Sequence, residues 1–325
     1  MTSAFAARRL PPKQMLAALR EICEDCAARS VRVIVDAESQ HFQHGIALTT
    51  LQLMREFNSR AAGEAVVYNT YQAYLKATPD QIAEHMRAAH DEGFTLGLKV
   101  VRGAYILSDD RKLIHDTKQD TDDAYNSIVR GALQQSFREF GGLGDDAAVT
   151  GGTAKKRHSF PSTNLLVASH NRESVFAAYE LHRQRVAAGL PTVPVAFGQL
   201  HGMSDEVSFG LLEHGRNLAV NTTHSSKRMI DSATPRAVVM DSGAGGSTLA
   251  DDAASAEGRL YTRRDRSAGP AAVPHVFKCT TWGSMSECIA YLVRRAVENR
   301  DAVLRTSDEY TALKSELWRR LLNRT

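Results

Sequence analysis

The stretch Thr95-Leu-Gly-Leu-Lys-Val-Val101 decides the fold that this sequence predicts. Apart from Lys99 it is apolar and partly β-branched, which is typical of a strand buried on both faces. Such strands occur in parallel sheets, because the crossover helices of these sheets cover both faces. Five further runs of five or six residues have the same character: Val31–Val35, Ala65–Thr70, Asn164–Ala168, Val193–Phe197 and Val273–Lys278.

Amphipathic segments separate these runs. Their apolar residues recur at intervals of three and four, which places them on one face of a helix. Thr121 and Ser204 are residue types that favour a helix N-cap, so helices are expected to begin at these two positions. The expected helices are Ile46–Phe57, Pro79–Asp91, Thr121–Phe137, Glu173–Arg185 and Ser204–Glu213. Strands that alternate with helices predict an α/β fold with a parallel sheet.

Two segments interrupt this alternation, at about residues 141–162 and 225–274. They are rich in small and polar residues and have no apolar period, so we expect disordered or loosely ordered insertions within a single domain of residues 1–325. The second insertion contains the basic cluster Arg263, Arg264 and Arg266. Contact with nucleic acid is one interpretation, but an isolated charge run is more typical of a solvated surface.

The composition indicates a globular protein, with 43% hydrophobic and 24% charged residues. The net charge of +3 is too small to predict a polyanionic partner. Cys23 and Cys26 have zinc-ligand spacing without a second matching pair, so no metal site is expected. The first 20 residues carry basic but no acidic side chains, which fits an organellar transit peptide and fits equally a helix from Met15 to Ala28.

Polar residues follow five of the six apolar runs. The carboxyl ends of parallel strands meet at one edge of a sheet or barrel, where catalytic groups collect. Lys99 also lies inside a run that is otherwise apolar, and a buried ammonium group requires an anionic partner or must lose its proton. This pattern favours an enzyme of barrel type. The residues concerned are Asp36, Gln72, Lys99, Arg102, His170, Gln199 and His201.

The stretch from Ile289 to Asn299 has no Gly or Pro and is predicted to be helical. At 100° per residue, one face carries a phenol, two guanidinium groups and a carboxylate. Two guanidinium groups can hold an anionic substrate in a bidentate grip. The alternative is a solvated face with an ordinary i, i+4 ion pair. The four residues are Tyr291, Arg294, Arg295 and Glu298.

These strand ends and this helix together resemble the proline dehydrogenase family, whose members oxidise L-proline to 1-pyrroline-5-carboxylate with FAD. Six stretches match in family order, and the order is more specific than any single motif. They are Val35–Glu38, Tyr68–Lys76, Lys99–Tyr105, Val167–Asn171, Phe197–Met203 and Tyr291–Asn299.

The resemblance implies a distorted (β/α)8 barrel of the TIM type, with FAD at the carboxyl ends of the strands and the last helix over the barrel mouth. It implies that Arg294 and Arg295 clamp the substrate carboxylate beside Tyr291, and that Asp36 pairs with Arg294. Tyr105 and Leu200 would pack around the pyrrolidine ring. The flavin contacts that it implies are Gln72, Lys99, Arg102, Gly103, His170 and Glu298.

The chain departs from the family pattern in three respects, one of which is the insertion at about residues 225–274, immediately before the last strand. Two family strands, one ending in a lysine near the substrate, have no counterpart before Val31, so we expect an N-terminally truncated barrel of about six strands. Such a barrel is either active or an incomplete fragment that needs its missing strands. Cys279 stands where proline-specific members usually have tyrosine, which resembles the hydroxyproline dehydrogenase branch.

The resemblance also implies partners and a location. The substrate would be proline or hydroxyproline, and the electrons would pass to a quinone-type acceptor. Family members are commonly mitochondrial, on the matrix side of the inner membrane, so peripheral membrane association is compatible with this reading. No nucleic acid partner and no metal are expected.

Overall fold

The computed structural model describes residues 2–59, 61, 63–142, 157–217, 273–298 and 306–322. The chain divides into two compact units, Met1–Leu212 with Pro274–Thr325, and Glu213–Val273. The second unit lies almost entirely outside the described residues. Residues 143–156 and 218–272 lie outside the described residues, and these ranges include most of the two predicted insertions.

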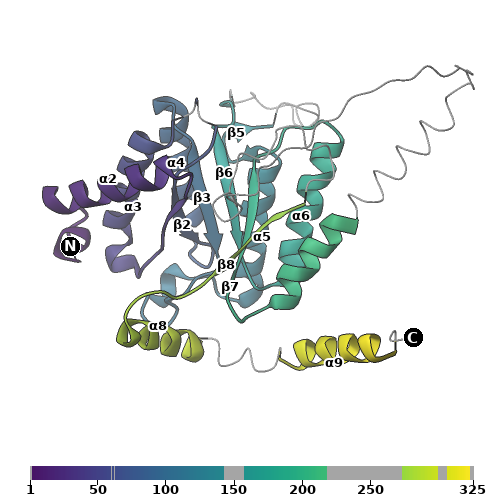
Figure 1. Ribbon diagram of the computed structural model, residues 1–325. Helices are drawn as coiled ribbons and strands as arrows, with labels where there is room; N and C mark the ends of the chain where they lie inside the picture. The colour runs from purple at the N-terminus through teal and green to yellow at the C-terminus, as the bar shows by residue number, and fades with distance from the viewer. Residues whose placement is uncertain are drawn as a thin grey trace, which may run out of the picture. The chain divides into compact units, whose positions relative to one another are not determined.

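Six parallel strands form a curled half-barrel sheet within the described part of the first unit, in the order of the sequence (Figure 1). This confirms the predicted α/β fold and its six strands. The strands are β1 (Val33–Val35), β2 (Val67–Gln72), β3 (Leu96–Val101), β6 (Thr163–Ala168), β7 (Val195–Leu200) and β8 (His275–Cys279).

Side chains from β2, β6 and β7 pack against one another on the inner, concave face of the curled sheet. Tyr68 of β2 reaches Leu166 of β6 and Ala196 of β7 in one buried cluster. Gly97 on the intervening β3 makes this possible, because a Cβ there would lie 3.0 Å from Cγ of Tyr68 and 2.1 Å from the Val67 carbonyl oxygen. The small residue thus lets an aromatic ring lie over the middle of the sheet.

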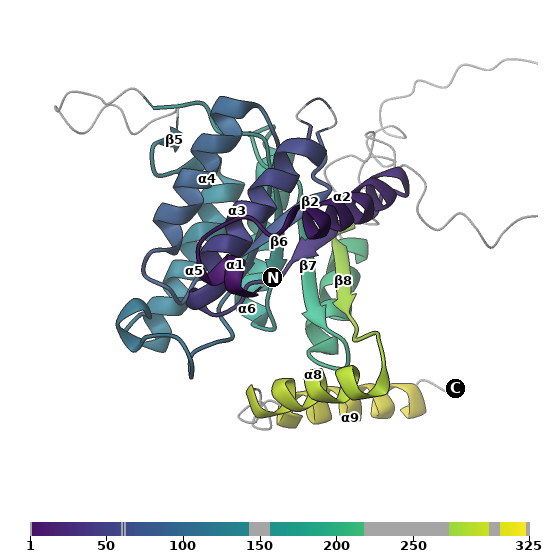
Figure 2. The same ribbon diagram turned by 90° about the vertical axis from the view of Figure 1, so that its left-hand side faces the viewer.

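Helices cover the outer face of the sheet (Figure 2). Helix α2 confirms the helix expected from Met15 to Ala28, and residues 205–217 confirm the one after β7. Besides the helix at residues 205–217, the described α-helices are α1 (Thr2–Ala6), α2 (Lys13–Ala28), α3 (Gln40–Phe57), α4 (Thr78–Glu92), α5 (Lys118–Leu133), α6 (Arg172–Ala187), α8 (Met285–Glu298) and α9 (Thr306–Leu322).

Helix α5 corrects one prediction at both of its ends. It begins at Lys118, because Thr117 rather than Thr121 is the N-cap: Thr117 Oγ1 accepts a hydrogen bond from the Asp120 N–H at 3.1 Å, and Asp120 accepts one from the Thr117 N–H at 2.9 Å. It ends at Leu133, because Ser136–Phe137 forms β4, which pairs with β5 (Phe140–Gly141). The first predicted insertion therefore begins inside a hairpin.

Asn58 joins the end of α3 to the sheet. Its buried amide donates hydrogen bonds to the carbonyls of Val67 (2.8 Å) and Thr95 (2.9 Å) and accepts two from the N–H groups of Val66 and Val67. All the polar groups of the Asn58 side-chain amide are thus hydrogen-bonded, which makes its burial tolerable.

Within the described part of the chain, no helix is long and apolar enough to cross a membrane.

Candidate active site

Lys99 and Asp36 form an ion pair at the carboxyl ends of β1 and β3. Lys99 Nζ donates to Asp36 Oδ1 at 2.5 Å. The side chain of Lys99 is only 16% exposed, whereas that of Asp36 is 75% exposed. The ammonium group inside an apolar strand therefore has the anionic partner that the sequence required. The expected pairing of Asp36 with Arg294 stays a prediction, because the side chain of Arg294 lies outside the described residues.

Helix α8 turns its polar side toward these strand ends. Burial and the neighbouring Cys279 raise the pKa of Tyr291; Asp36 also raises it and Arg295 lowers it. The guanidinium carbon of Arg295 lies 5.4 Å from the centroid of the Tyr291 ring. Tyr291 and Arg295 are half-buried. Tyr291 thus lies close to the tip of β8 and to Asp36, with Arg295 beside it.

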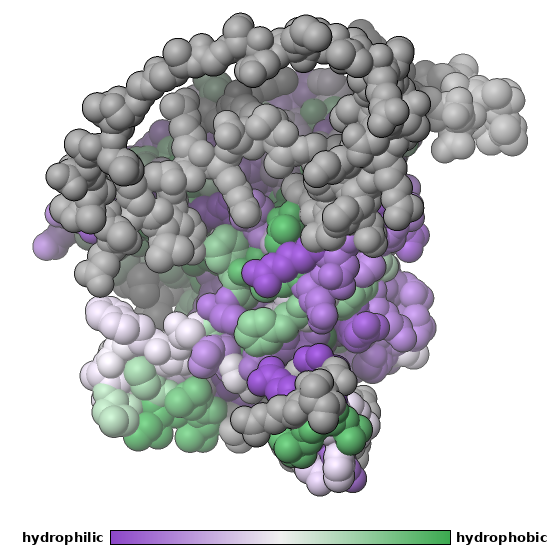
Figure 3. All heavy atoms as spheres, turned by 45° about the vertical axis from the view of Figure 1, so that its right-hand side comes forward, coloured by the Kyte–Doolittle hydropathy of each residue, from purple (hydrophilic) through white to green (hydrophobic). Residues whose placement is uncertain are grey.

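The apolar side of α8 is the exposed one. Leu292 and Val293 are each 55% exposed, and Ile289 is also exposed. A solvated surface helix has the opposite arrangement, so the described side chains favour a polar face turned toward the strand ends. The alternative, an ion pair between Arg294 and Glu298, involves side chains outside the described residues. Apolar groups gather at the lower edge of the molecule in Figure 3, the level of α8 and α9 in Figure 1.

Gln72 at the end of β2 joins two of the loops at the strand ends. Its side chain is buried, donates to the Glu38 carbonyl at 3.2 Å and accepts from the Ala104 N–H at 3.1 Å. Gly103 has φ of 145°, and a Cβ there would lie 2.2 Å from the Tyr74 ring. The backbone after β3 therefore packs directly on an aromatic face, which only glycine permits at this position.

Arg102 lies across the ends of β3 and β6. Its Nε donates to Asp122 Oδ1 at 2.6 Å, and its two terminal nitrogens donate to the hydroxyls of Ser169 (2.8 Å) and Ser174 (3.0 Å). The guanidinium carbon lies 4.4 Å from the centroid of the buried Tyr125 ring. Four side chains thus hold Arg102 from α5, α6 and the end of β6.

Asp122 is a residue of this network that the sequence analysis missed. Burial alone would raise the pKa of its carboxyl, but hydrogen bonds from Lys118 and Arg102 outweigh burial and lower the pKa. The carboxylate is therefore ionised at neutral pH. Its sequence neighbourhood suggested only the start of a helix, because the partner Arg102 is 20 residues away and meets it only in the folded chain.

His170 and Leu200 meet at the ends of β6 and β7. The Leu200 N–H donates to His170 Nε2 at 3.0 Å, so neutral His170 carries its proton on Nδ1. Tyr105 and Leu200 are both half-buried at this edge.

The sequence analysis gave no indication of a role for Lys278 of β8. Its Nζ donates to the Met203 carbonyl at 2.9 Å and pairs with Asp205 at 2.5 Å.

The residues at the strand ends fit the FAD that the resemblance implies. Lys99, Arg102 and Gln72 bring hydrogen-bond donors, which suit the acceptor-rich flavin and diphosphate groups. Gly198 of β7 leaves room on the inner face, since a Cβ there would meet only Leu166, at 3.7 Å. In the described residues, no group of three His, Cys, Asp or Glu side chains gathers as metal ligands.

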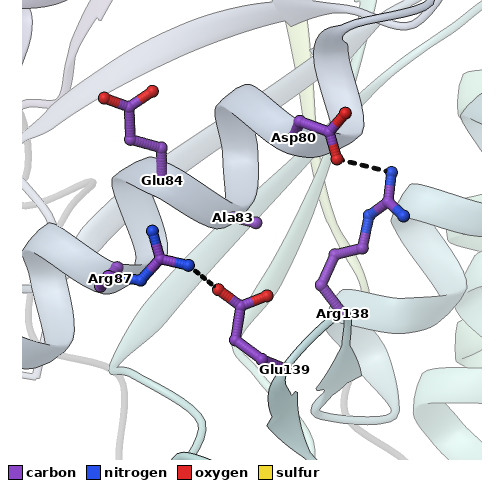
Figure 4. A pocket seen from close by; sticks show the side chains of 6 residues that line it. All are labelled: Asp80, Ala83, Glu84, Arg87, Arg138 and Glu139. Atoms are coloured by element: carbon purple, nitrogen blue, oxygen red, sulfur yellow. Dashed lines mark hydrogen bonds and ion pairs between the residues drawn. The ribbon is translucent and has the colours of Figure 1, made fainter.

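A hollow lies away from the strand ends, between α4 and the β4–β5 hairpin (Figure 4). Asp80 pairs with Arg138 at 2.8 Å, and Arg87 pairs with Glu139. Its lining carries three carboxylates, with Glu84 as the third, and two guanidinium groups, and this excess of negative charge does not suit an anionic ligand. The strand ends remain the candidate site.

Comparison with known proteins gives matches to one family. The family model described as proline dehydrogenase matches residues 3–228. The chain is 28% identical to the "Probable proline dehydrogenase, mitochondrial" of Schizosaccharomyces pombe, over 93% of this chain and 49% of that protein. It is 31% identical to the hydroxyproline dehydrogenase of Homo sapiens, over 94% of this chain and 51% of that protein. The chain thus spans about half the length of these curated relatives.

A solved structure shares the fold. The crystal structure of proline utilization A from Bdellovibrio bacteriovorus, inactivated by N-propargylglycine, aligns with a TM-score of 0.53 and 15% identity. The alignment covers 88% of this chain and 22% of that one. At this identity the likeness concerns the fold alone, and it agrees with a barrel-type sheet. From the matched family model, the chain belongs to the proline dehydrogenase family.

Proposed function

We propose that this chain carries the catalytic region of an FAD-dependent enzyme that oxidises L-proline to 1-pyrroline-5-carboxylate in proline catabolism. One observation carries the proposal: the polar face of α8, with Tyr291 and Arg295, lies toward the Lys99–Asp36 pair and Cys279. A cluster of cations, a phenol and a carboxylate at the ends of barrel strands suits a small anionic substrate.

In this proposal Arg294 and Arg295 bind the substrate carboxylate, and Tyr291 lies beside them. Clamping one end of a rigid five-membered ring orients the carbon next to nitrogen. Tyr105 and Leu200 pack around the ring and exclude water. Asp36 balances the charge of Lys99 and adjoins the clamp.

Bound FAD would take up the hydride that leaves the ring carbon, while the ring nitrogen loses its proton and a C=N bond forms. Lys99 would stabilise negative charge on the reduced cofactor. The other residues proposed to hold it are Gln72, Arg102, Gly103, His170 and Glu298. A quinone would be the next electron acceptor, and the matrix side of the mitochondrial inner membrane, with peripheral membrane contact, the proposed location.

The second candidate substrate is trans-4-hydroxy-L-proline. Cys279 favours it, because the thiol lies beside Tyr291 and is smaller than the tyrosine of proline-specific members. That difference leaves room for a 4-hydroxyl group. Relatives named hydroxyproline dehydrogenase are compatible with this candidate.

A second candidate function is a barrel half that catalyses only when further strands bind. The inner residues Ile34 of β1 and Phe277 of β8 are 42% and 37% exposed, although both lie on the concave face of the sheet. Open sheet edges are sites where additional strands pair. Under this candidate the isolated chain binds FAD weakly and turns over no substrate.

A visible spectrum of the purified chain tests the proposal. We expect flavin absorption bands that bleach when L-proline or trans-4-hydroxy-L-proline is added without oxygen. L-Leucine, which has a carboxylate but no ring, serves as the control ligand and should leave the bands unchanged. Protein that stays colourless and takes up no added FAD would overturn the proposal.

The carboxylate clamp predicts a specific kinetic effect. Arg294→Met and Arg295→Met should each raise the KM for the amino acid at least about tenfold while FAD content stays unchanged, because a charged hydrogen bond to the carboxylate is lost. Arg29→Met, at the exposed C-cap of α2, is the matched control. An unchanged KM in both clamp variants would reject the clamp.

A further inference from the structure

Arg102 is the best-anchored cation at the candidate site. Its three nitrogens each donate one hydrogen bond, to Asp122, Ser169 and Ser174, and the Tyr125 ring lies beneath the group. A guanidinium has five N–H groups, so two remain on the terminal nitrogens of a group whose plane is already set. An arginine held in this way presents donors in a defined direction.

Among the described residues, Asp122 supplies the carboxylate that contacts Arg102. It comes from the second turn of α5, and its side chain is 13% exposed. Its other oxygen accepts from Lys118 Nζ at 2.5 Å, and that lysine is 84% exposed. Asp122 thus bridges a solvent-facing lysine and the half-buried arginine.

We propose that Asp122 is a positioning residue that acts through Arg102 to bind the acceptor-rich flavin dinucleotide. The inference rests on the proposed function and adds to it a residue outside the strand ends. Without the carboxylate, the guanidinium loses its strongest directional contact, because a hydrogen bond between two charged groups is about twice as strong as a neutral one. The arginine then samples other rotamers and binds FAD less tightly.

A purely structural role makes a different prediction. Asp122 lies beyond the first turn of α5, where helix-dipole stabilisation by an acidic residue has largely faded. If it only stabilised the helix, its loss would lower thermal stability without changing FAD affinity. If it acts through Arg102, its effect must vanish once Arg102 is gone.

The test is titration of the flavin-free full chain with FAD, followed by flavin fluorescence. We expect Asp122→Asn to raise the Kd for FAD about tenfold. Asp123→Asn, at the exposed neighbour that accepts from Gln119, should change the Kd less than about twofold. Asp122→Asn combined with Arg102→Met should match Arg102→Met alone, because the two residues act as one unit.

Each outcome of the FAD titration supports or overturns the positioning role of Asp122. Wild-type affinity in Asp122→Asn, or a full additional tenfold loss on top of Arg102→Met, overturns the positioning role alone. A wild-type chain that binds no FAD overturns the proposed function and this inference with it. If Asp122→Asn fails the circular dichroism check for folding, Asp122→Glu replaces it, since it keeps the charge but displaces the carboxylate, and the same tenfold loss is expected.

Discussion

Cys279 is the residue that we expect to determine the preference between L-proline and trans-4-hydroxy-L-proline. It ends β8 on the inner face of the sheet and lies beside Tyr291. Cys279→Tyr should shift the ratio of kcat/KM for L-proline over trans-4-hydroxy-L-proline toward proline about tenfold, because the larger ring fills the space for the 4-hydroxyl. Cys26→Tyr on α2 makes the same substitution far from the site. An unaltered ratio would remove Cys279 from the specificity argument.

His85 is expected to set part of the acid sensitivity. It is buried in α4, its Nδ1 lies 2.7 Å from the Tyr71 hydroxyl, and burial lowers its pKa to about 4. The unfolded chain takes up the proton near pH 6.5, so stability is complete above that pH and falls as pH drops toward 4. From pH 7 to pH 5 we expect a loss of about 2 kcal/mol.

Urea unfolding at both pH values measures this effect. His85→Gln keeps a polar partner for Tyr71 but does not titrate in this range, so it should lose about 2 kcal/mol less between pH 7 and pH 5 than the wild type. His41→Gln, at an exposed position of α3, should behave like the wild type. A wild-type protein equally stable at pH 5 and pH 7 would contradict the role of His85.

At the scale of the element, α5 depends on its capping box. Thr117→Ala should lower the free energy of unfolding by about 1 kcal/mol, because it leaves an N–H of the first turn without its side-chain acceptor. Thr121→Ala, one turn later, should cost under about 0.5 kcal/mol, since its hydroxyl only donates back to the Thr117 carbonyl. Chemical denaturation compares the two, and equal losses would show that the cap is misassigned.

At the scale of the whole molecule, Arg32 links the two ends of the curled sheet. Its guanidinium carbon lies 5.9 Å from the Tyr68 ring centroid on β2 and 5.6 Å from the Phe277 ring centroid on β8. Arg32→Ala should lower the free energy of unfolding by about 1–2 kcal/mol, the sum of two cation–π contacts. A double-mutant cycle with Phe277→Leu measures the coupling, with Arg29→Ala as control. Zero coupling would mean that the contact does not hold the curl.

The sequence by itself determined the elements. Each buried strand is a short apolar run, and each helix between strands has an apolar period, so both can be recognised from neighbouring residues alone. The alternation of the two predicts a parallel sheet, and polar residues after the strands indicate one functional edge. Lys99 was also recognisable, since an ammonium group in an apolar run must find an anion.

Only the tertiary structure decided which groups meet. Asp36 and Lys99 are 63 residues apart, and Arg102 and Asp122 are 20 apart, so neither pair shares a local pattern. The ends of α5 also depended on geometry, because the cap at Thr117 and the β4–β5 hairpin compete with continued helix. The polar side of α8 turned inward for the same reason: periodicity defines two faces of a helix, and only packing against the strand ends selects which one is buried.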